Sequence, residues 1–358
     1  MTIRLKTAPA ALAVLAALVV TGARPASAHG TSHGDGTVVT DYRYEITSFD
    51  PGVDGIDLVF VGAIGHLQLT NRSGSEVTVL GYEDEPYLRV GPDGAFVNLR
   101  SPATYLNEDR DGSTGAPESA DADADPRWER LSEDPVVRWH DHRAHWMTST
   151  PAVVLSDPDS SHDLGTWTVA VEIDGRRVVA EGTTTWVPAP DGDPWAIAIA
   201  GITIVATLAL ASRWWRPMTA VLGGLLVIPG VALAIGAWNA SPAMWSDKLT
   251  AAAVPALLVT SVAVGVVLLG RAPRDGSIIV AMGAGGLVLI EGVVRLGHLT
   301  SSQLPTTLPP SVDRVGIALV MSLGLGLLLG PIVRWTWAWL HRPVTPSRVA
   351  NRLPSSEG

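Results

Sequence analysis

The chain of 358 residues contains no cysteine. It can therefore form no disulfide, no cysteine-ligated blue-copper centre and no thiol nucleophile. Three motifs of hydrolytic enzymes are missing as well: the phosphate-binding G-x-x-x-x-G-K-[ST] loop, the G-x-S-x-G nucleophile elbow and the zinc-protease pattern H-E-x-x-H. We therefore expect a protein that is not an enzyme and whose fold is stabilised without disulfides.

Residues 1–28 have the organisation of a secretory signal peptide. Arg4 and Lys6 precede an apolar run from Ala8 to Val20, and the sequence ASA at 26–28 fits an A-x-A cleavage site. The apolar run is too short for a stable membrane span. The pattern predicts cleavage after residue 28 and a mature chain that begins at His29.

A Gly- and His-rich leader follows at 29–36, with the sequence HGTSHGDG. A free N-terminal amine and the imidazole of the same residue can chelate Cu(II) in a tight ring, which makes His29 a candidate copper ligand with His33 close by. The alternative is a flexible leader whose histidines belong to no site, since Gly-rich segments are normally disordered.

Charge is distributed unevenly along the chain. Residues 29–193 contain 30 acidic and 11 basic side chains, although the whole chain has a formal net charge of only -10. An acidic surface repels nucleic acid and favours cations. We expect no nucleic-acid partner for this segment.

Residues 37–193 are predicted to form an extracytoplasmic all-β domain. Apolar and polar residues alternate over 41–46 and 167–173, as in half-buried strands, and Asp-Gly pairs at 93–94 and 174–175 indicate hairpin turns. Further strands are expected at 56–61, 65–70, 76–82, 87–90 and 95–99, with a returning strand that ends near 186. About eight strands favour an immunoglobulin-like or cupredoxin-like sandwich, and the acidic segment 107–126 is expected to be a long loop.

The segment VRWHDHRAHWM, residues 137–147, has the highest density of histidine in the chain, with His140, His142 and His145 between two tryptophans. On a strand, the first two would project from the same face, and a bulge or bend near residues 143–144 would bring His145 and the thioether of Met147 to that side. The result would be a His3Met site. Imidazoles with a soft sulfur suit copper, and three imidazoles alone suit zinc equally well. The alternative is a core strand whose histidines only form hydrogen bonds with nearby loops.

Residues 194–340 contain five apolar stretches, at about 195–212, 218–237, 249–270, 277–297 and 315–339, which predict five transmembrane helices in a lipid bilayer. Most arginines of this half fall on one side, which places the tail 341–358 in the cytoplasm and the β-domain outside the cell membrane. A stripe of small residues, Ser322, Gly326 and Gly330, is typical of a helix-packing face.

The fourth predicted helix carries charges. Glu291 and Arg295 are spaced i, i+4 and His298 follows one turn later, so all three are expected on one face near the outer surface. Charges at this depth are costly and often mark function, such as the acceptance of a cation or proton. A structural ion pair with Arg295 directed towards the interface is the alternative.

The blocks GYEDEPYLRV and WHDHRAHWM, together with the signal peptide and the helical half, resemble those of an uncharacterised family of exported actinobacterial membrane proteins, and this resemblance implies no activity. The general plan is also similar to that of copper-resistance proteins of the CopC and CopD type. This second resemblance is architectural. It implies copper binding, with His29 as the one residue it carries over, whereas the Asp-Gly-His-Pro element of such proteins is missing here.

Three functions remain open from the sequence. The first is an extracytoplasmic metal-handling protein that binds copper, or zinc, through its histidines. The second is a non-catalytic β-sandwich interaction module that is anchored by the helices and binds an unknown protein partner. The third is an ion transporter that uses Glu291.

Overall fold

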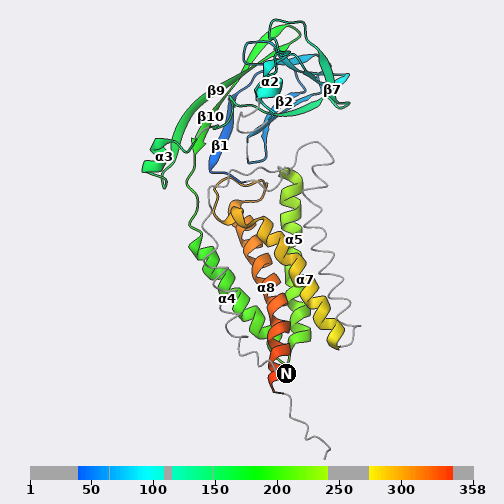
Figure 1. Ribbon diagram of the computed structural model, residues 1–358, viewed down its shortest axis with the longest axis vertical. Helices are drawn as coiled ribbons and strands as arrows, with labels where there is room; N and C mark the ends of the chain where they lie inside the picture. Colours follow the sequence, from blue (N-terminus) through cyan, green and yellow to red (C-terminus); the bar gives the residue numbers. More distant parts are fainter. Residues whose placement is uncertain (1–38, 64, 109–114, 148, 241–273, 342–358) are drawn as a thin grey trace, which may run out of the picture.

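The computed structural model describes residues 39–63, 65–108, 115–147, 149–240 and 274–341. The predicted signal peptide, the leader with His29 and His33, the predicted span at 249–270 and nearly all of the predicted tail lie outside these ranges. Figure 1 shows a β-domain that stands on one end of a group of helices. The chain passes from one part to the other between Trp186 and Asp193.

Within the described residues, the β-domain consists of two antiparallel sheets. One sheet has seven strands in the order β1-β10-β9-β4-β5-β6-β7, and the other has three in the order β2-β3-β8. The strands are β1 (Tyr42–Ser48), β2 (Ile56–Val61), β3 (His66–Asn71), β4 (Val77–Leu80), β5 (Pro86–Gly91), β6 (Gly94–Asn98), β7 (Trp128–Ser132), β8 (Val136–His140), β9 (His162–Ile173) and β10 (Arg176–Trp186). Two short helices, α2 (Pro102–Leu106) and α3 (Ala152–Ser156), lie in the connections.

The two sheets enclose one hydrophobic core. Leu67, Leu69 and Trp139 of the small sheet and Val79, Val90 and Val171 of the large sheet are all buried in it. On β9, the buried residues alternate with more exposed ones, which is the period-2 pattern of a strand with one face on a core. The domain is thus sandwich-like, as expected, because each sheet has one apolar face to bury.

Most of the predicted strands are confirmed, and β10 ends at Trp186 as predicted. The turn at Asp174 and Gly175 has positive φ at both residues, +48° and +77°, as a two-residue type I′ hairpin requires. The strand β7 and the two short helices were not predicted. Residues 115–127 of the acidic segment contain no helix or strand, whereas Asn107 belongs to the C-terminal cap of α2.

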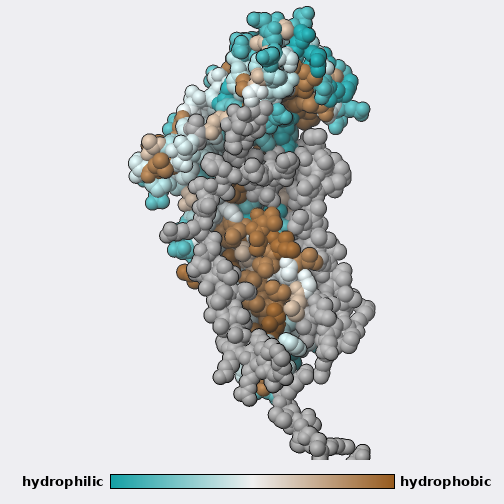
Figure 2. Space-filling model, in the orientation of Figure 1, coloured by the Kyte–Doolittle hydropathy of each residue, from teal (hydrophilic) through white to brown (hydrophobic). Residues whose placement is uncertain are grey.

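The helical part contains α4 (Asp193–Ala211), α5 (Trp215–Ala240), α7 (Arg274–Val294), the 3-10 helix η1 (Leu296–Leu299) and α8 (Pro310–Leu340). Among the described helices, three are long and apolar enough to cross a membrane: α4, α5 and α8. On the face that Figure 2 displays, hydrophobic side chains gather over the helices, while the β-domain surface is mostly hydrophilic. This contrast is consistent with a membrane protein that carries a water-exposed domain.

Helix α8 packs against α4, α5 and α7, and its small residues allow the close approach. A Cβ atom at Gly326 would lie 2.5 Å from Cβ of Ala206 on α4, and one at Gly330 would lie 2.4 Å from Cβ of Leu210. The predicted small-residue stripe therefore faces α4, where van der Waals contact between backbones replaces the hydrophobic effect that lipid cannot provide.

The two parts of the chain touch through a short antiparallel bridge between Thr40 and Gln303. The backbone N–H of Gln303 donates to the carbonyl of Thr40 at 2.9 Å, and the N–H of Ser302 donates to Oδ1 of Asp41 at 2.7 Å. Burial raises the pKa of Asp41 above its usual value, although its hydrogen bonds with Ser302 counteract part of this rise. The start of β1 is thereby tied to the loop that follows η1.

We predict that Gly326→Leu destabilises the helical part by about 1–3 kcal/mol, because the new side chain would collide with Ala206 in a packed interface. Thermal unfolding of the protein in detergent measures the loss. The matched control is Gly201→Leu on α4, where an added Cβ meets nothing within 4 Å. Equal melting temperatures for the two variants would contradict a close α4–α8 contact at Gly326.

Candidate metal-binding site

The pairing of β3 with β8 brings a fourth histidine to the predicted cluster. His66 begins β3 and lies directly opposite His140, the last residue of β8. The centroids of the two rings are 5.3 Å apart. His66 is isolated in the sequence, 74 positions before its partner. Sequence analysis missed it because only the cross-strand register brings the two residues together.

The expectation that His140 and His142 share one strand face was wrong. The strand β8 ends at His140, and residues 142–145 form a turn followed by a bend, so the structure has the bend and not the bulge of the two expected alternatives. The N–H of Ala144 donates to the carbonyl of Asp141 at 3.0 Å, which closes the turn. Turn formation, and not strand alternation, therefore determines where His142 and His145 lie.

The turn nevertheless gathers the predicted imidazoles. Ring centroids are separated by 3.8 Å between His140 and His145, 5.3 Å between His140 and His142, and 5.6 Å between His142 and His145. His140 and His145 are buried, whereas His142 is half-buried. Together with His66, these rings form what we call the four-histidine cluster. Met147 is half-buried two residues beyond His145 and stays a predicted ligand.

The buried carboxylate of Asp141 organises this turn. Its oxygens accept hydrogen bonds from the indole Nε1 of Trp139 at 2.9 Å and from the backbone N, Nε and Nη2 of Arg143 at 3.1, 2.9 and 2.8 Å. Burial by itself would raise the pKa of Asp141, but the hydrogen bonds and charge of Arg143 outweigh it and hold this pKa below its usual value. Asp141 is therefore an anion in the folded protein at neutral pH.

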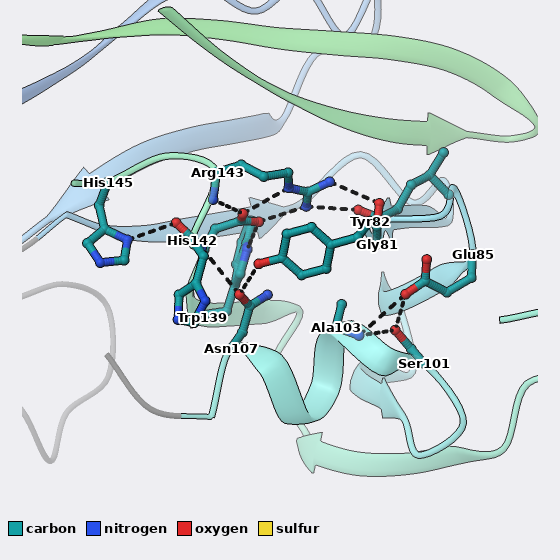
Figure 3. A network of polar contacts seen from close by, with 12 residues as sticks. Gly81, Tyr82, Glu85, Ser101, Ala103, Asn107, Trp139, His142, Arg143 and His145 are labelled. Carbon is teal, nitrogen blue, oxygen red and sulfur yellow. Dashed lines mark hydrogen bonds and ion pairs between the residues drawn. The ribbon is translucent and has the colours of Figure 1, made fainter. Parts of the chain in front are cut away.

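Arg143 and Asn107 fasten the turn to the rest of the domain, as Figure 3 shows. The guanidinium of Arg143 donates to the carbonyls of Leu80 and Gly81, both at 3.0 Å, and lies 4.9 Å from the ring centroid of Tyr82. Oδ1 of Asn107 accepts from the hydroxyl of Tyr82 at 2.5 Å and from the backbone N–H of His142 at 3.2 Å. Burial raises the pKa of Tyr82 to about 12, so its hydroxyl stays a donor.

One hydrogen bond determines which ring nitrogen of His145 carries the proton. Its Nδ1 lies 3.1 Å from the carbonyl oxygen of Asp141, and because a carbonyl can only accept, Nδ1 carries the proton. In the neutral ring, Nε2 is then a lone-pair donor, which is the arrangement of metal-binding histidines whose other nitrogen is held by a carbonyl. This Nε2 lies 2.9 Å from Nε2 of His140.

The separation of these two nitrogens can be compared with that in a metal site. Two nitrogens bound at ~2.0 Å to one tetrahedral ion lie ~3.3 Å apart. The observed 2.9 Å also fits a hydrogen bond between His140 and His145. In the described part of the chain, no group of three or more histidine, aspartate or glutamate side chains forms a ready-made metal site.

The cluster lies towards the helical end of the β-domain. Tyr44 of β1 is 6.4 Å from the ring of His145, and its hydroxyl accepts from the backbone N–H of Trp146 at 3.3 Å. Tyr42 stacks on Trp146 at 6.2 Å. Asp41 contacts the loop after η1, and Tyr44, which lies beside His145, follows it by three residues, or about 10 Å of extended chain. The cluster therefore lies close to the helical part.

Three acidic residues in a row, Glu83, Asp84 and Glu85, precede β5. The contacts of Asp84 and Glu85 are with groups outside the four-histidine cluster. Glu85 is buried and accepts from the hydroxyl of Ser101 at 2.6 Å and from the backbone N–H of Ala103, at the N-terminus of α2. Asp84 pairs with Arg177 at 2.7 Å on the surface. These carboxylates stabilise the local fold.

Glu291, Arg295 and His298 occupy a second polar site at the helical end nearest the β-domain. Nε of Arg295 donates to Oε1 of Glu291 at 2.5 Å, and both side chains are buried. The expected common helix face was wrong for His298, because α7 ends at Val294 and His298 lies in η1. There Nδ1 of His298 pairs with Oδ1 of Asp313 on α8 at 2.7 Å, a partner that the sequence analysis missed.

Comparison of the chain with protein-family models, with curated proteins and with solved structures found no match. No family is therefore identified, and the resemblance to copper-resistance proteins stays a prediction from the sequence. The function has to be argued from the geometry of the two polar sites.

We predict that Arg143→Met destabilises the β-domain by about 3–5 kcal/mol at neutral pH, because it leaves the buried Asp141 carboxylate without a compensating charge. The double variant with Asp141→Asn should be more stable than Arg143→Met alone. Urea unfolding of the metal-free protein measures both. The matched control, Arg177→Met, removes an exposed pair and should change stability little.

The contribution of the Asp141–Arg143 pair to the stability of the β-domain depends on pH. The pKa of Asp141 is lower in the folded protein than its usual value of 3.8, so its contribution is complete well above pH 3.8 and is lost as the pH falls through the lowered pKa. The stability difference between the wild type and the double variant should shrink in that acid range. A difference that stays constant down to about pH 2 would show that Asp141 does not titrate with unfolding.

Proposed function

We propose that this protein binds copper outside the membrane through the four-histidine cluster, as a membrane-anchored protein of metal homeostasis. The observation that carries the proposal is the gathering of His140, His142 and His145 by one turn, with His66 beside His140 on the adjacent strand. Imidazole clusters of this density are suited to Cu(II), Cu(I) and Zn(II). A thioether from Met147 would favour copper over zinc.

The surroundings of the cluster support a binding role. The Asp141–Arg143 pair and the Asn107 contact hold the turn before any metal binds, so little conformational entropy would be lost on binding. The carbonyl of Asp141 orients His145 so that Nε2, which lies 2.9 Å from Nε2 of His140, would be its ligand atom. The acidic composition of residues 29–193 raises the local concentration of cations. His29 and His33 are proposed as further Cu(II) ligands.

For the membrane part we propose five spans, with the β-domain outside the cell and the tail inside. Three described apolar helices support a multi-pass arrangement, and α7 lies beside them with an apolar segment at 285–294. The distribution of arginines supports the orientation. In this arrangement the four-histidine cluster lies on the extracytoplasmic side of the cell membrane.

The competing function is a non-catalytic interaction module. The 2.9 Å contact of His140 with His145 and the Nδ1 bond of His145 to a carbonyl are also what structural histidines make. The two functions differ in one measurable property, which is metal affinity.

We predict that the full-length protein in detergent binds one equivalent of Cu(II) at the cluster. His142→Ala should lower this affinity by at least about tenfold. Changing a residue that only hydrogen-bonds to a metal ligand already costs ~10- to 100-fold in affinity, and loss of the ligand itself should cost more. Binding should weaken as the pH falls from about 7.5 to about 5.5, where protons compete for imidazole nitrogens. Competition with a chromogenic chelator measures both effects.

His162→Ala is the matched control, because His162 is a half-buried residue at the start of β9 that lies outside the cluster. His66→Ala tests the fourth ligand, and His29→Ala with His33→Ala shows whether the leader forms part of the same site or adds a separate equivalent. Copper binding by His142→Ala that equals the wild type, or unfolding of this variant without metal, would favour the interaction module.

Topology is tested by single cysteines, which the cysteine-free chain allows without background. We predict that a cysteine at Ser160 reacts with a membrane-impermeant thiol reagent in intact cells and that one at Ser355 reacts only after lysis. Equal labelling of both in intact cells would contradict the proposed orientation.

A further inference from the structure

The pair formed by His298 and Asp313 has features that the proposed metal function does not use. Both side chains are fully buried, and Nδ1 of His298 is bound to Oδ1 of Asp313 at 2.7 Å. Within the residues that the structure describes, Nε2 of His298 and Oδ2 of Asp313 have no hydrogen-bond partner. Buried polar atoms in folded proteins almost always have one, so atoms of this kind are where bound water or an exchangeable ligand is expected.

The charged groups around the pair come from both packed helices. The buried Glu291 of α7 pairs with Arg295, the N-cap residue of η1, and Nη1 of Arg295 has no partner among the described residues. On α8, Arg314 follows Asp313 and donates to the carbonyls of His298 and Ser301 at 3.0 and 2.9 Å. The negative charges of Glu291 and Asp313 are thus matched by the positive charges of Arg295 and Arg314.

This environment selects the ligand. A metal ion would find one imidazole nitrogen and one oxygen of Asp313 as ligands, beside two guanidiniums, which is too few ligands for a protein metal site. A proton requires only one lone pair. When Nδ1 donates to a buried carboxylate, Nε2 presents its lone pair to a proton and the carboxylate stabilises the resulting imidazolium, as in the histidine–aspartate pairs of hydrolases.

We infer that His298 is a proton-binding site of the helical part, with Nε2 as the accepting atom and Asp313 as the residue that stabilises the protonated ring. A hydronium ion gives its proton to the Nε2 lone pair and leaves as water, and the reverse step returns the proton. Asp313 is a positioning residue in this exchange. His298 directly precedes the loop that Thr40 and Asp41 contact, so the site lies at the end of the helical part nearest the β-domain.

The test is hydrogen–deuterium exchange at C2 of each histidine, followed by mass spectrometry on the full-length protein in lipid nanodiscs over about pH 5 to about 9, the range in which histidines generally titrate. This exchange reports protonation of individual imidazoles. For His298 we expect a sigmoidal profile whose midpoint falls by about one to three pH units in Asp313→Asn, because an opposite charge within reach favours the charged ring. His162, on the surface of β9, is the internal reference and should not change.

Two results would overturn the inference. One is a His298 that does not exchange at any pH while His162 does, which would identify a sealed structural pair. The other is an identical midpoint with and without the Asp313 carboxylate. If Asp313→Asn does not fold, Asp313→Glu retains the charge, and the wild-type profile decides between exchange and a sealed pair.

The proton site does not depend on copper binding. His142→Ala should leave the His298 profile unchanged, and Asp313→Asn should leave the copper affinity unchanged. Failure of the metal titration and failure of the exchange experiment are therefore distinguishable.

Discussion

The candidate site depends on one buried anion, the carboxylate of Asp141. It is fully inaccessible to solvent, and four hydrogen bonds from Trp139 and Arg143 neutralise the cost of its burial. Through Arg143 this charge connects β8 to the carbonyls that follow β4, and through its own carbonyl Asp141 holds Nδ1 of His145. The histidines lie where they do because the chain turns around this group.

The β-domain and the helical part are joined by a small number of polar contacts close to both sites. Thr40 and Asp41 bind the loop after η1, while Tyr42 and Tyr44, on the same strand, contact Trp146 and His145. One short strand therefore separates the four-histidine cluster from the polar site at the end of the helices.

In the helical part, glycine residues at the helix interfaces allow the helices to pack closely. Gly326 and Gly330 of α8 allow backbone contact with α4, and Gly324 of α8 approaches the backbone of α7 near Leu289. Such contacts bring α7 near enough to α8 for η1 and Asp313 to meet. The buried pair of His298 and Asp313 is thus a consequence of the same small-residue faces that hold the helices together.

The sequence by itself determined the features that depend on local periodicity: the strands, the hairpin turn at Asp174, the apolar helices and the small-residue face of α8. It also indicated a candidate histidine site at residues 140–145, because three of the nine histidines fall within six residues. The tertiary structure alone decided the rest. His66 joins the cluster through strand register, Asp313 pairs with His298 through helix packing, and the turn at Asp141 depends on Arg143 reaching Leu80 and Gly81. These contacts join residues far apart in the chain, and no local pattern specifies them.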